Sequence, residues 1–247
     1  MLGKTETVTI RTLFRYLSAF LVALCVPASS HAEEDFRIWE NMTAIINLGS
    51  VDKRLDKWRW WVEAQGRFRE KGGAADQALA RTGLGYQLTD KASVWLGFAY
   101  VGNYPNIRRN FDEYRAWQQL MIADKPSFGD VTSRTRLEQR FIEGINPVEW
   151  RLRQFVRFAR PIYDGSPVSV VLWDEVFVRI NSPTPATPFG FDQNRGFAGL
   201  GYTFSNQLRI EVGYMNQFLL FRTLSRREQR FDQRMNHILS LSMFLNL

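Results

Sequence analysis

A strict alternation of apolar and charged residues constrains the fold of this chain more than any other feature. From Trp58 to Arg69 the order is Trp-Arg-Trp-Trp-Val-Glu-Ala-Gln-Gly-Arg-Phe-Arg. Because successive side chains of a β-strand point to opposite faces, this segment predicts a strand with one apolar face and one charged face. Similar segments of about ten residues recur along the chain, which is the length of a tilted strand that crosses a bilayer. The sequence therefore predicts a transmembrane β-barrel with aromatic and aliphatic residues toward lipid.

The alternation and the turn-forming residues between segments predict eleven strands. These are Phe36 to Asn47, Lys57 to Glu70, Gln77 to Leu88, Ala92 to Tyr104, Asp112 to Ile122, Val131 to Ile142, Glu149 to Arg160, Val168 to Asn181, Phe191 to Phe204, Gln207 to Phe221 and Arg234 to Asn246. Bacterial single-chain barrels use even strand numbers. Either the first segment is not a full strand, then, or one strand has been missed. The expected fold is all-β, a single antiparallel transmembrane barrel of 10–12 strands.

Counting backward from Leu247 orients the strands. This count places the short turns at Asp90 and Asn206 in the periplasm, and the longer loops Ser182 to Gly190 and Thr223 to Asp232 outside the cell. Such an arrangement is typical of outer-membrane barrels, which have short periplasmic turns and longer extracellular loops.

The first 32 residues resemble a secretory signal peptide. Lys4, Arg11 and Arg15 precede an apolar run from Tyr16 to Val26, and Ser30-His31-Ala32 forms a small-x-small cleavage site. The run is too short for a membrane-spanning helix, which needs roughly 20 residues. We therefore expect residues 1–32 to be removed and residues 33–247 to form the barrel domain in the outer membrane of a Gram-negative bacterium. The mature chain then has no cysteine.

Composition excludes two other classes of protein. The chain has 32 Lys and Arg against 25 Asp and Glu, a formal net charge of +7, which raises nucleic acid as a partner. Export argues against nucleic acid. The mean hydropathy of -0.27 excludes a helical membrane protein but is compatible with a barrel, whose strands are apolar at every second position.

An internal repeat links two parts of the chain. Gly83 to Lys91 matches Gly199 to Gln207, and in the same register Gly97-Phe98 matches Gly213-Tyr214. The Gly-x-Gly pairs also resemble a phosphate-binding loop, but no helix pattern follows either copy and the third glycine is missing. Each copy is better interpreted as two strands joined by a tight turn, with the glycines serving barrel packing.

Assigning the apolar face of each strand to lipid turns the charged face into the lumen. The predicted lumen residues are Arg59, Glu63, Arg67, Arg69, Arg81, Glu113, Arg115, Arg134, Arg136, Glu138, Arg140, Arg151, Arg153, Arg157, Glu175, Arg179, Arg195, Arg209 and Glu211. We take as the candidate charge network Arg67, Arg81, Glu113, Arg115, Arg134, Arg136, Glu138, Arg140, Arg153, Glu175, Arg195 and Glu211. Arginine suits a packed ionic interior because its guanidinium forms multidentate bonds with carboxylates. The glutamates are too few to neutralise the arginines, so the excess must meet water, small anions or an acidic ligand.

Several segments carry a resemblance to a known family. They are Arg134 to Phe141, Glu113-Tyr114-Arg115, Asp174 to Phe177, Phe191 to Arg195 and Gly213 to Gln217. With them the chain resembles an uncharacterised family of Gram-negative outer-membrane β-barrels, known only as a domain of unknown function. The resemblance implies fold and membrane but no activity. The terminal Phe244-Leu245-Asn246-Leu247 resembles the signal read by the barrel-assembly machinery, and lipid and lipopolysaccharide are the other expected partners.

Two functions from different classes remain. The first is a passive barrel, either a narrow anion-preferring pore or an anion-binding or structural protein. The second is a lipid-modifying hydrolase or acyl transferase centred on His237, the one histidine left after residue 32. The neighbouring Ser240 and Ser242 point away from the face of His237. We assign no catalytic residue and expect neither a cofactor nor a metal site, because one histidine and no cysteine remain to bind a metal.

Overall fold

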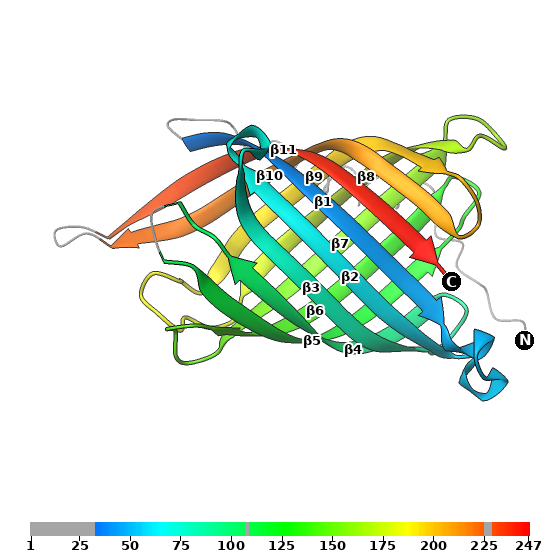
Figure 1. The fold of residues 1–247 in the computed structure, drawn as a ribbon, viewed down its shortest axis with the longest axis horizontal. Coiled ribbons are helices and arrows are strands. Elements are labelled where there is room, and N and C mark those ends of the chain that lie inside the picture. Colours follow the sequence, from blue (N-terminus) through cyan, green and yellow to red (C-terminus); the bar gives the residue numbers. More distant parts are fainter. Residues whose placement is uncertain (1–32, 107–108, 225–228) are drawn as a thin grey trace, which may run out of the picture. The chain divides into compact units, whose positions relative to one another are not determined.

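The computed structural model describes residues 33–106, 109–224 and 229–247, and its strands close into one barrel (Figure 1). The eleven strands are β1 (Glu33–Asn47), β2 (Trp58–Arg69), β3 (Ala74–Gln87), β4 (Ala92–Asn103), β5 (Phe111–Asp124), β6 (Asp130–Ile142), β7 (Glu149–Pro161), β8 (Val168–Arg179), β9 (Gly190–Thr203), β10 (Leu208–Leu224) and β11 (Gln229–Asn246). Three short 3-10 helices are η1 (Leu48–Ser50), η2 (Lys53–Leu55) and η3 (Glu70–Gly72). The closed all-β barrel is confirmed. The predicted signal peptide, residues 1–32, lies outside the described residues.

The barrel closes through one parallel pair of strands. β1 runs beside β11 in the same direction, with Glu40 opposite Leu241 and Asn41 opposite Ser242, whereas every other neighbouring pair is antiparallel. The expectation that the first segment is incomplete or that one strand is missing is therefore wrong. A parallel seam joins the first and last strands of an odd-numbered meander, because those two strands run in the same direction. The expectation of a purely antiparallel barrel fails at this one seam.

The two ends of the barrel differ. At one end, which we name the turn end, lie the turns at Asp90 and Asn206 together with Leu247. There the Asn246 N–H donates to Gln207 O over 2.8 Å. The opposite end, the loop end, carries the connections at residues 104–110, 143–148 and 180–189. The predicted placement of both short turns beside the C-terminal strand end is confirmed.

The predicted loop from Thr223 to Asp232 is mostly strand. β10 continues to Leu224 and β11 begins at Gln229, with Phe221 opposite Asp232 in the register of the hairpin (Figure 1). The alternation of apolar residues stops before the pairing of the two strands ends. Pairing continues because the backbone hydrogen bonds of a ladder do not depend on side-chain polarity.

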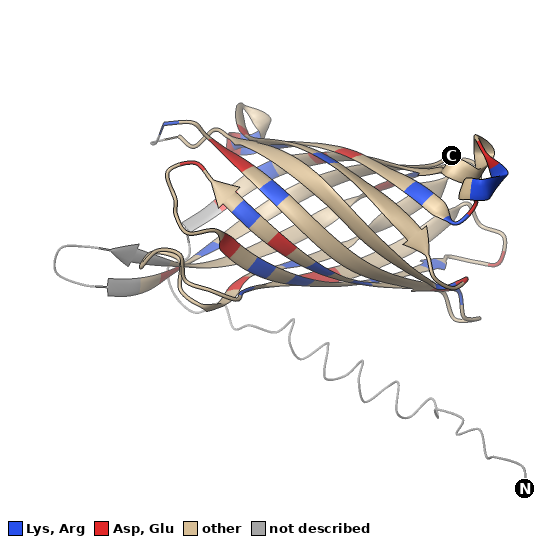
Figure 2. Ribbon diagram, turned by 90° about the horizontal axis from the view of Figure 1, so that it is seen from below, with Lys and Arg blue, Asp and Glu red and all other residues tan. Residues whose placement is uncertain are grey.

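Burial alternates along the strands. Large apolar side chains such as Leu96, Leu172 and Leu241 are exposed on the outer face of the barrel. Charged positions occur within the strands as well as at the ends of the barrel (Figure 2), and many of the arginines and glutamates are buried. Within the described residues, no helix has the length and hydropathy needed to cross a membrane.

Glycines of the first copy of the repeat lie under large rings. A Cβ atom on Gly85 would lie 2.4 Å from the Trp95 ring, and one on Gly97 would lie 2.2 Å from the Trp117 ring. Both copies of the repeat are β-hairpins, formed by β3 with β4 and by β9 with β10. The repeat therefore serves packing, and the phosphate-loop alternative is excluded because no helix follows either copy.

Candidate functional site

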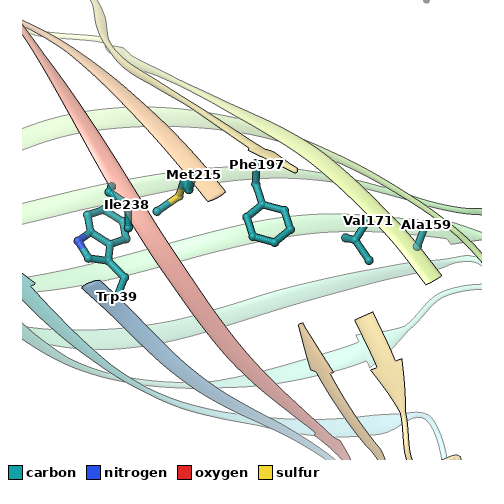
Figure 3. Close-up of a cluster of buried hydrophobic side chains, with 6 residues drawn as sticks. All are labelled: Trp39, Ala159, Val171, Phe197, Met215 and Ile238. Carbon is teal, nitrogen blue, oxygen red and sulfur yellow. The ribbon is translucent and has the colours of Figure 1, made fainter. Parts of the chain in front are cut away.

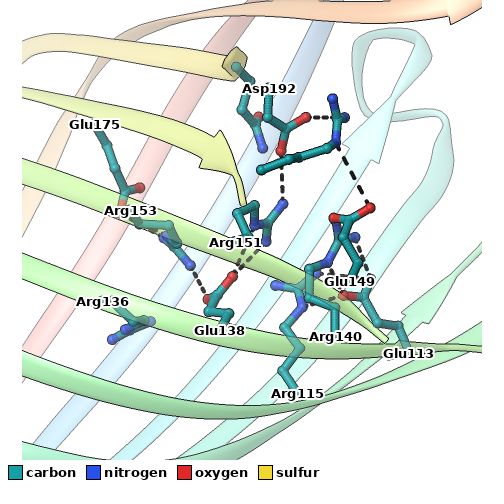
Figure 4. A network of polar contacts seen from close by, with 12 residues as sticks. Glu113, Arg115, Arg136, Glu138, Arg140, Glu149, Arg151, Arg153, Glu175 and Asp192 are labelled. Carbon is teal, nitrogen blue, oxygen red and sulfur yellow. Dashed lines mark hydrogen bonds and ion pairs between the residues drawn. The ribbon is translucent and has the colours of Figure 1, made fainter. Parts of the chain in front are cut away.

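A network of buried ion pairs joins strands that are not neighbours in the barrel (Figure 4). At its centre Glu138 on β6, which is 0% exposed, accepts hydrogen bonds from Arg153 Nη1 at 2.6 Å and from Arg151 Nη2 at 2.7 Å. Arg81 Nη2 on β3 lies 4.0 Å from Glu138 Oε1, although β4 and β5 separate the two strands. Arg81 in turn donates to Glu63 on β2 at 2.7 Å. The network therefore crosses the interior of the barrel.

Two branches extend from this centre. On one side, Arg153 and Arg134 each lie 2.7 Å from Glu175 Oε1 on β8. On the other side, Arg151 pairs with Asp192 at 3.2 Å, and Arg179 also contacts Asp192. Carboxylates from β6, β8 and β9 are thus each shared by two or more arginines, an arrangement that the multidentate guanidinium group makes possible.

A third branch fills the loop end. Glu113 on β5 accepts from Arg115 Nε at 2.6 Å and also contacts Arg140, which bridges to Glu149 at the start of β7. Arg179 lies 3.9 Å from Glu149 and joins this branch to Asp192. The connected set, which we name the ion-pair network, has six acids and eight arginines: Glu63, Glu113, Glu138, Glu149, Glu175, Asp192, Arg81, Arg115, Arg134, Arg140, Arg151, Arg153, Arg179 and Arg195.

Sequence reasoning missed two acids of the network. Glu149 lies two residues before Arg151 and therefore on the same face of the strand, so the alternation alone predicts that it points inward. Asp192 lies inside because the pairing of β8 with β9 shifts register between Phe177 and Val178, which leaves Asp192 and Gln193 both buried. An extra residue in a strand breaks the two-residue period, and simple alternation places Asp192 on the wrong face.

Two predicted members lie near the network but form no ion pair within 4.0 Å in the described part of the chain. Arg136, 0% exposed, donates to Gln119 Oε1 at 2.6 and 2.8 Å and lies 4.5 Å from the centroid of the Trp117 ring. Arg67 donates to the side-chain oxygens of Gln77 and Gln65 at 2.6 and 2.7 Å. Neutral amides and aromatic faces replace carboxylates at both positions.

The remaining predicted lumen residues lie toward the ends. Glu211 at the turn end pairs with Arg209 at 2.9 Å and with Arg157, forming a separate cluster of one acid and two arginines. Arg59 donates to Asn47 Oδ1 at 2.8 Å beside η1. Arg69 donates to the backbone oxygens of Ala75 and Tyr104 near the loop end.

Large apolar residues lie inside the barrel as well as on its outer face, so the interior is not formed by charged residues alone. One buried position on each of six successive strands from β7 through β11 to β1 forms an apolar cluster (Figure 3): Ala159, Val171, Phe197, Met215, Ile238 and Trp39. A second cluster consists of Trp61, Trp95, Ala99 and Trp117. The rings of Trp39, Trp61 and Trp117 in these clusters lie against arginine guanidinium groups.

A cavity of about 730 Å³ occupies the interior toward the turn end. Its lining includes exposed residues at that end, among them Lys91, Asp124 and Lys125, so the cavity opens there. Its deepest part meets the ion-pair network at Arg81, Arg153 and Glu175. We name this space the chamber. The interior thus has two parts, a region closed by ion pairs toward the loop end and a chamber open at the turn end.

Seven arginines line the chamber: Arg67, Arg81, Arg134, Arg153, Arg157, Arg195 and Arg209. The Nε–H groups of five of them are buried without a hydrogen-bond acceptor among the described residues: Arg67, Arg81, Arg134, Arg157 and Arg195. Buried polar groups are normally hydrogen-bonded, so the charge of these guanidinium groups is incompletely satisfied by the described residues.

His237 lies on the other face of the barrel wall. Its Nδ1 is 2.6 Å from the hydroxyl of Tyr214, and it shares its side of β11 with exposed Leu239, whereas Ser240 is buried inside. The predicted separation of His237 from Ser240 is confirmed. Among the described residues, no group of three His, Cys, Asp or Glu side chains has the proximity of a metal site.

Comparison with known proteins identifies a family without a known activity. The model of "Protein of unknown function (DUF2490)" matches residues 36–229. An uncharacterised protein of Methylorubrum extorquens is 32% identical over 243 residues, covering 94% of this chain and 99% of that protein. No solved structure matches. The predicted resemblance to a family of unknown function is confirmed, and the chain belongs to the DUF2490 family.

Proposed function

We propose that the protein is an outer-membrane β-barrel whose bore is closed by ion pairs and whose chamber binds anions at the turn end. The observation that carries the proposal is the contrast between the two parts of the interior. Toward the loop end, arginines are bound by acids such as Glu113 and Glu138. Toward the turn end, arginines line an open space, and several of them have a buried Nε–H group without an acceptor among the described residues.

The outer face supports a membrane location. Exposed leucines and aromatic residues cover it, including Leu96 at 61% exposure, which is unfavourable in water and favourable in lipid. Some polar side chains on the outer face hydrogen-bond to each other. Gln118 and Gln139 exchange two hydrogen bonds of 3.1 and 2.9 Å between β5 and β6, which lowers the cost of facing hydrocarbon. The predicted signal peptide and C-terminal assembly signal point to the same location.

The sign of the charge supports anions as the ligands. Arg67 has no carboxylate within 4.0 Å in the described residues, and Arg195 has only Glu175, at 4.0 Å. Desolvated guanidinium groups without a full set of counterions are costly, and an anion relieves that cost. Charged walls of low dielectric also focus their field on the enclosed space. The chamber therefore concentrates anions and excludes cations.

Planar-bilayer recording tests the closed bore. The refolded barrel should insert without discrete conductance steps, because the ion-pair network occupies the cross-section of the bore. Conductance steps with anion preference would contradict the closed bore. They would support the second candidate function, a narrow anion-preferring pore, which the excess of arginines favours. Cation-selective steps would overturn both.

Collisional quenching of tryptophan fluorescence tests the anion chamber. Trp39, Trp61 and Trp173 line it. In liposomes, iodide should quench the fluorescence more than caesium at equal ionic strength, because the positive chamber attracts the anion. Equal quenching by both ions would overturn anion binding in the chamber. Recovery of the protein as a soluble periplasmic species would overturn the membrane location.

A further inference from the structure

Two arginines in the chamber share one aromatic ring. The guanidinium carbon of Arg67 on β2 lies 4.1 Å from the centroid of the Trp39 ring, and that of Arg195 on β9 lies 4.8 Å from the same centroid. β10 and β11 separate Arg195 from Trp39 on β1. The Trp39 ring therefore brings two positive charges together from strands on different sides of the bore.

Their charge is poorly compensated within the described residues. The side chain of Arg67 donates to the neutral amides of Gln65 and Gln77, and Arg195 has one carboxylate oxygen, of Glu175, at 4.0 Å. Both Nε–H groups are buried without an acceptor, and both side chains are nine-tenths buried or more. Two desolvated cations that share one neutral ring form a site for a group with negative charge and several acceptor oxygens.

An aromatic wall lies next to this pair, toward the turn end. Phe155 on β7 lies one inward position closer to the mouth of the chamber than Arg153. Trp173 on β8 has the same relation to Glu175, and Phe197 on β9 has it to Arg195. The rings of Trp173 and Phe197 stack with centroids 5.1 Å apart and planes at 8°, and Phe155 lies 5.6 Å from Trp173. The wall is an apolar surface that faces the chamber.

We infer that the chamber binds an amphiphile with one compact acidic head group, a carboxylate or a phosphate, and a single apolar tail. The head group binds against Arg67 and Arg195 where they line the chamber, and the tail lies along the wall of Phe155, Trp173 and Phe197 toward the mouth. The chamber volume of about 730 Å³ is within the range of small-molecule pockets, which are mostly apolar with a few polar groups that fix orientation. This inference rests on the proposed anion chamber and names its ligand class.

Simpler ligands fit the observations less well. A small inorganic anion satisfies Arg67 and Arg195 but leaves the aromatic wall against water. A neutral apolar ligand covers the wall but leaves the charges of Arg67 and Arg195 without a counterion. Only a molecule with both parts accounts for both features.

Three eight-carbon compounds and acetate test the ligand class on the refolded full chain in lipid nanodiscs, with empty nanodiscs as the baseline. Calorimetric titration should show binding of octanoate and of octyl phosphate, and the tighter of the two identifies the head group. Acetate and octanol should each bind at least about ten-fold more weakly, because each lacks one of the two parts. Octanol binding as tight as octanoate binding would overturn the inference.

Variants locate the site. Arg67→Gln with Arg195→Gln should weaken octanoate binding by at least about ten-fold, whereas Arg54→Gln, which removes a charge from an exposed connection, should leave it unchanged. Ser242→Trp narrows the chamber without touching either arginine and should also abolish binding. Octanoate binding that survives Ser242→Trp, or that survives the double variant in its folded state, would overturn the assignment.

The iodide and caesium measurement separates this inference from the proposed function. If iodide still quenches more than caesium but octanoate binds no better than acetate, the chamber binds anions and the amphiphile is wrong. If the two ions quench equally, the anion chamber itself is wrong.

Discussion

Arg81 on β3 lies 4.0 Å from Glu138 on β6, measured between Nη2 and Oε1, across the space enclosed by the barrel. The two strands are separated in the sheet by β4 and β5. Their ion pair therefore connects two strands that are not neighbours in the barrel. It belongs to a network that reaches from Glu63 on β2 to Asp192 on β9. At this depth, ion pairs between buried side chains cross the space that the barrel encloses.

Replacing Glu138 by glutamine should strongly destabilise the barrel. Arg151 and Arg153 would keep a buried hydrogen-bond acceptor but lose the charge that compensates theirs. Breaking a buried ion pair from one side costs about 3 to 5 kcal/mol. Urea unfolding of the refolded protein, followed by tryptophan fluorescence, measures this loss.

The matched control is Glu70→Gln. Glu70 is exposed and lies 3.3 Å from Arg69, and exposed pairs contribute about 0 to 1 kcal/mol. Equal effects of the two substitutions would show that Glu138 is hydrated and that the bore is open at that depth.

A disulfide should report the parallel seam. Asn41 on β1 lies opposite Ser242 on β11, so the Asn41→Cys and Ser242→Cys pair should oxidise, and paired positions on adjacent strands have the Cα separation that a disulfide needs. The chain has one cysteine, Cys25 within the predicted signal peptide, so the new bond is unambiguous on a non-reducing gel.

The control pair combines Asn41→Cys with Asn246→Cys. In the parallel register Asn246 lies opposite Ile45, which places it four residues, roughly 13 Å, further along the strand. This pair should not oxidise. Cross-linking of the control and not of the first pair would contradict the register of the seam.

Gly85→Ala should be destabilising, whereas its counterpart in the internal repeat, Gly201→Ala, should be tolerated. A Cβ on Gly85 meets the Trp95 ring at 2.4 Å, whereas one on Gly201 meets Val171 Cγ2 at 3.2 Å. Overpacking of this kind costs about 1 to 3 kcal/mol. Trp95→Leu in the Gly85→Ala background should recover part of the loss, and additive effects in this double-mutant cycle would contradict the clash.

Arginine substitutions at two depths test the proposed membrane location. Leu96 lies within β4 and Leu88 just after β3 at the turn end, and both are exposed. Leu96→Arg should lower the free energy of unfolding in liposomes by about 2 to 4 kcal/mol, and Leu88→Arg by about 0 to 1 kcal/mol, because the cost of a charge falls toward the bilayer surface. Equal costs at both positions would place the outer face in water.

The strands could be predicted almost completely from the sequence. The alternation in residues 58–69 places β2 within one residue at its start and its end, and all eleven predicted segments correspond to strands. Alternation is sufficient because the two-residue period of a strand is a local property of the backbone, and each strand here has one face in the interior. The same parity turned Glu63, Arg81 and Glu138 inward, where they are buried.

The tertiary structure decided the features that depend on distant residues. The direction of β1 beside β11, the inward turn of Asp192 at the register shift and the reach of Arg81 to Glu138 all arise from closure of the sheet. Closure brings together strands that are far apart in the chain, and a bulge reverses the parity that alternation assumes. The sequence determined which side chains are charged and which face of a strand they share. The geometry of the closed barrel decided which arginines pair with a carboxylate and which, like Arg67, line the chamber without one. A long guanidinium side chain pairs with an acid only where closure of the sheet brings that acid within its reach.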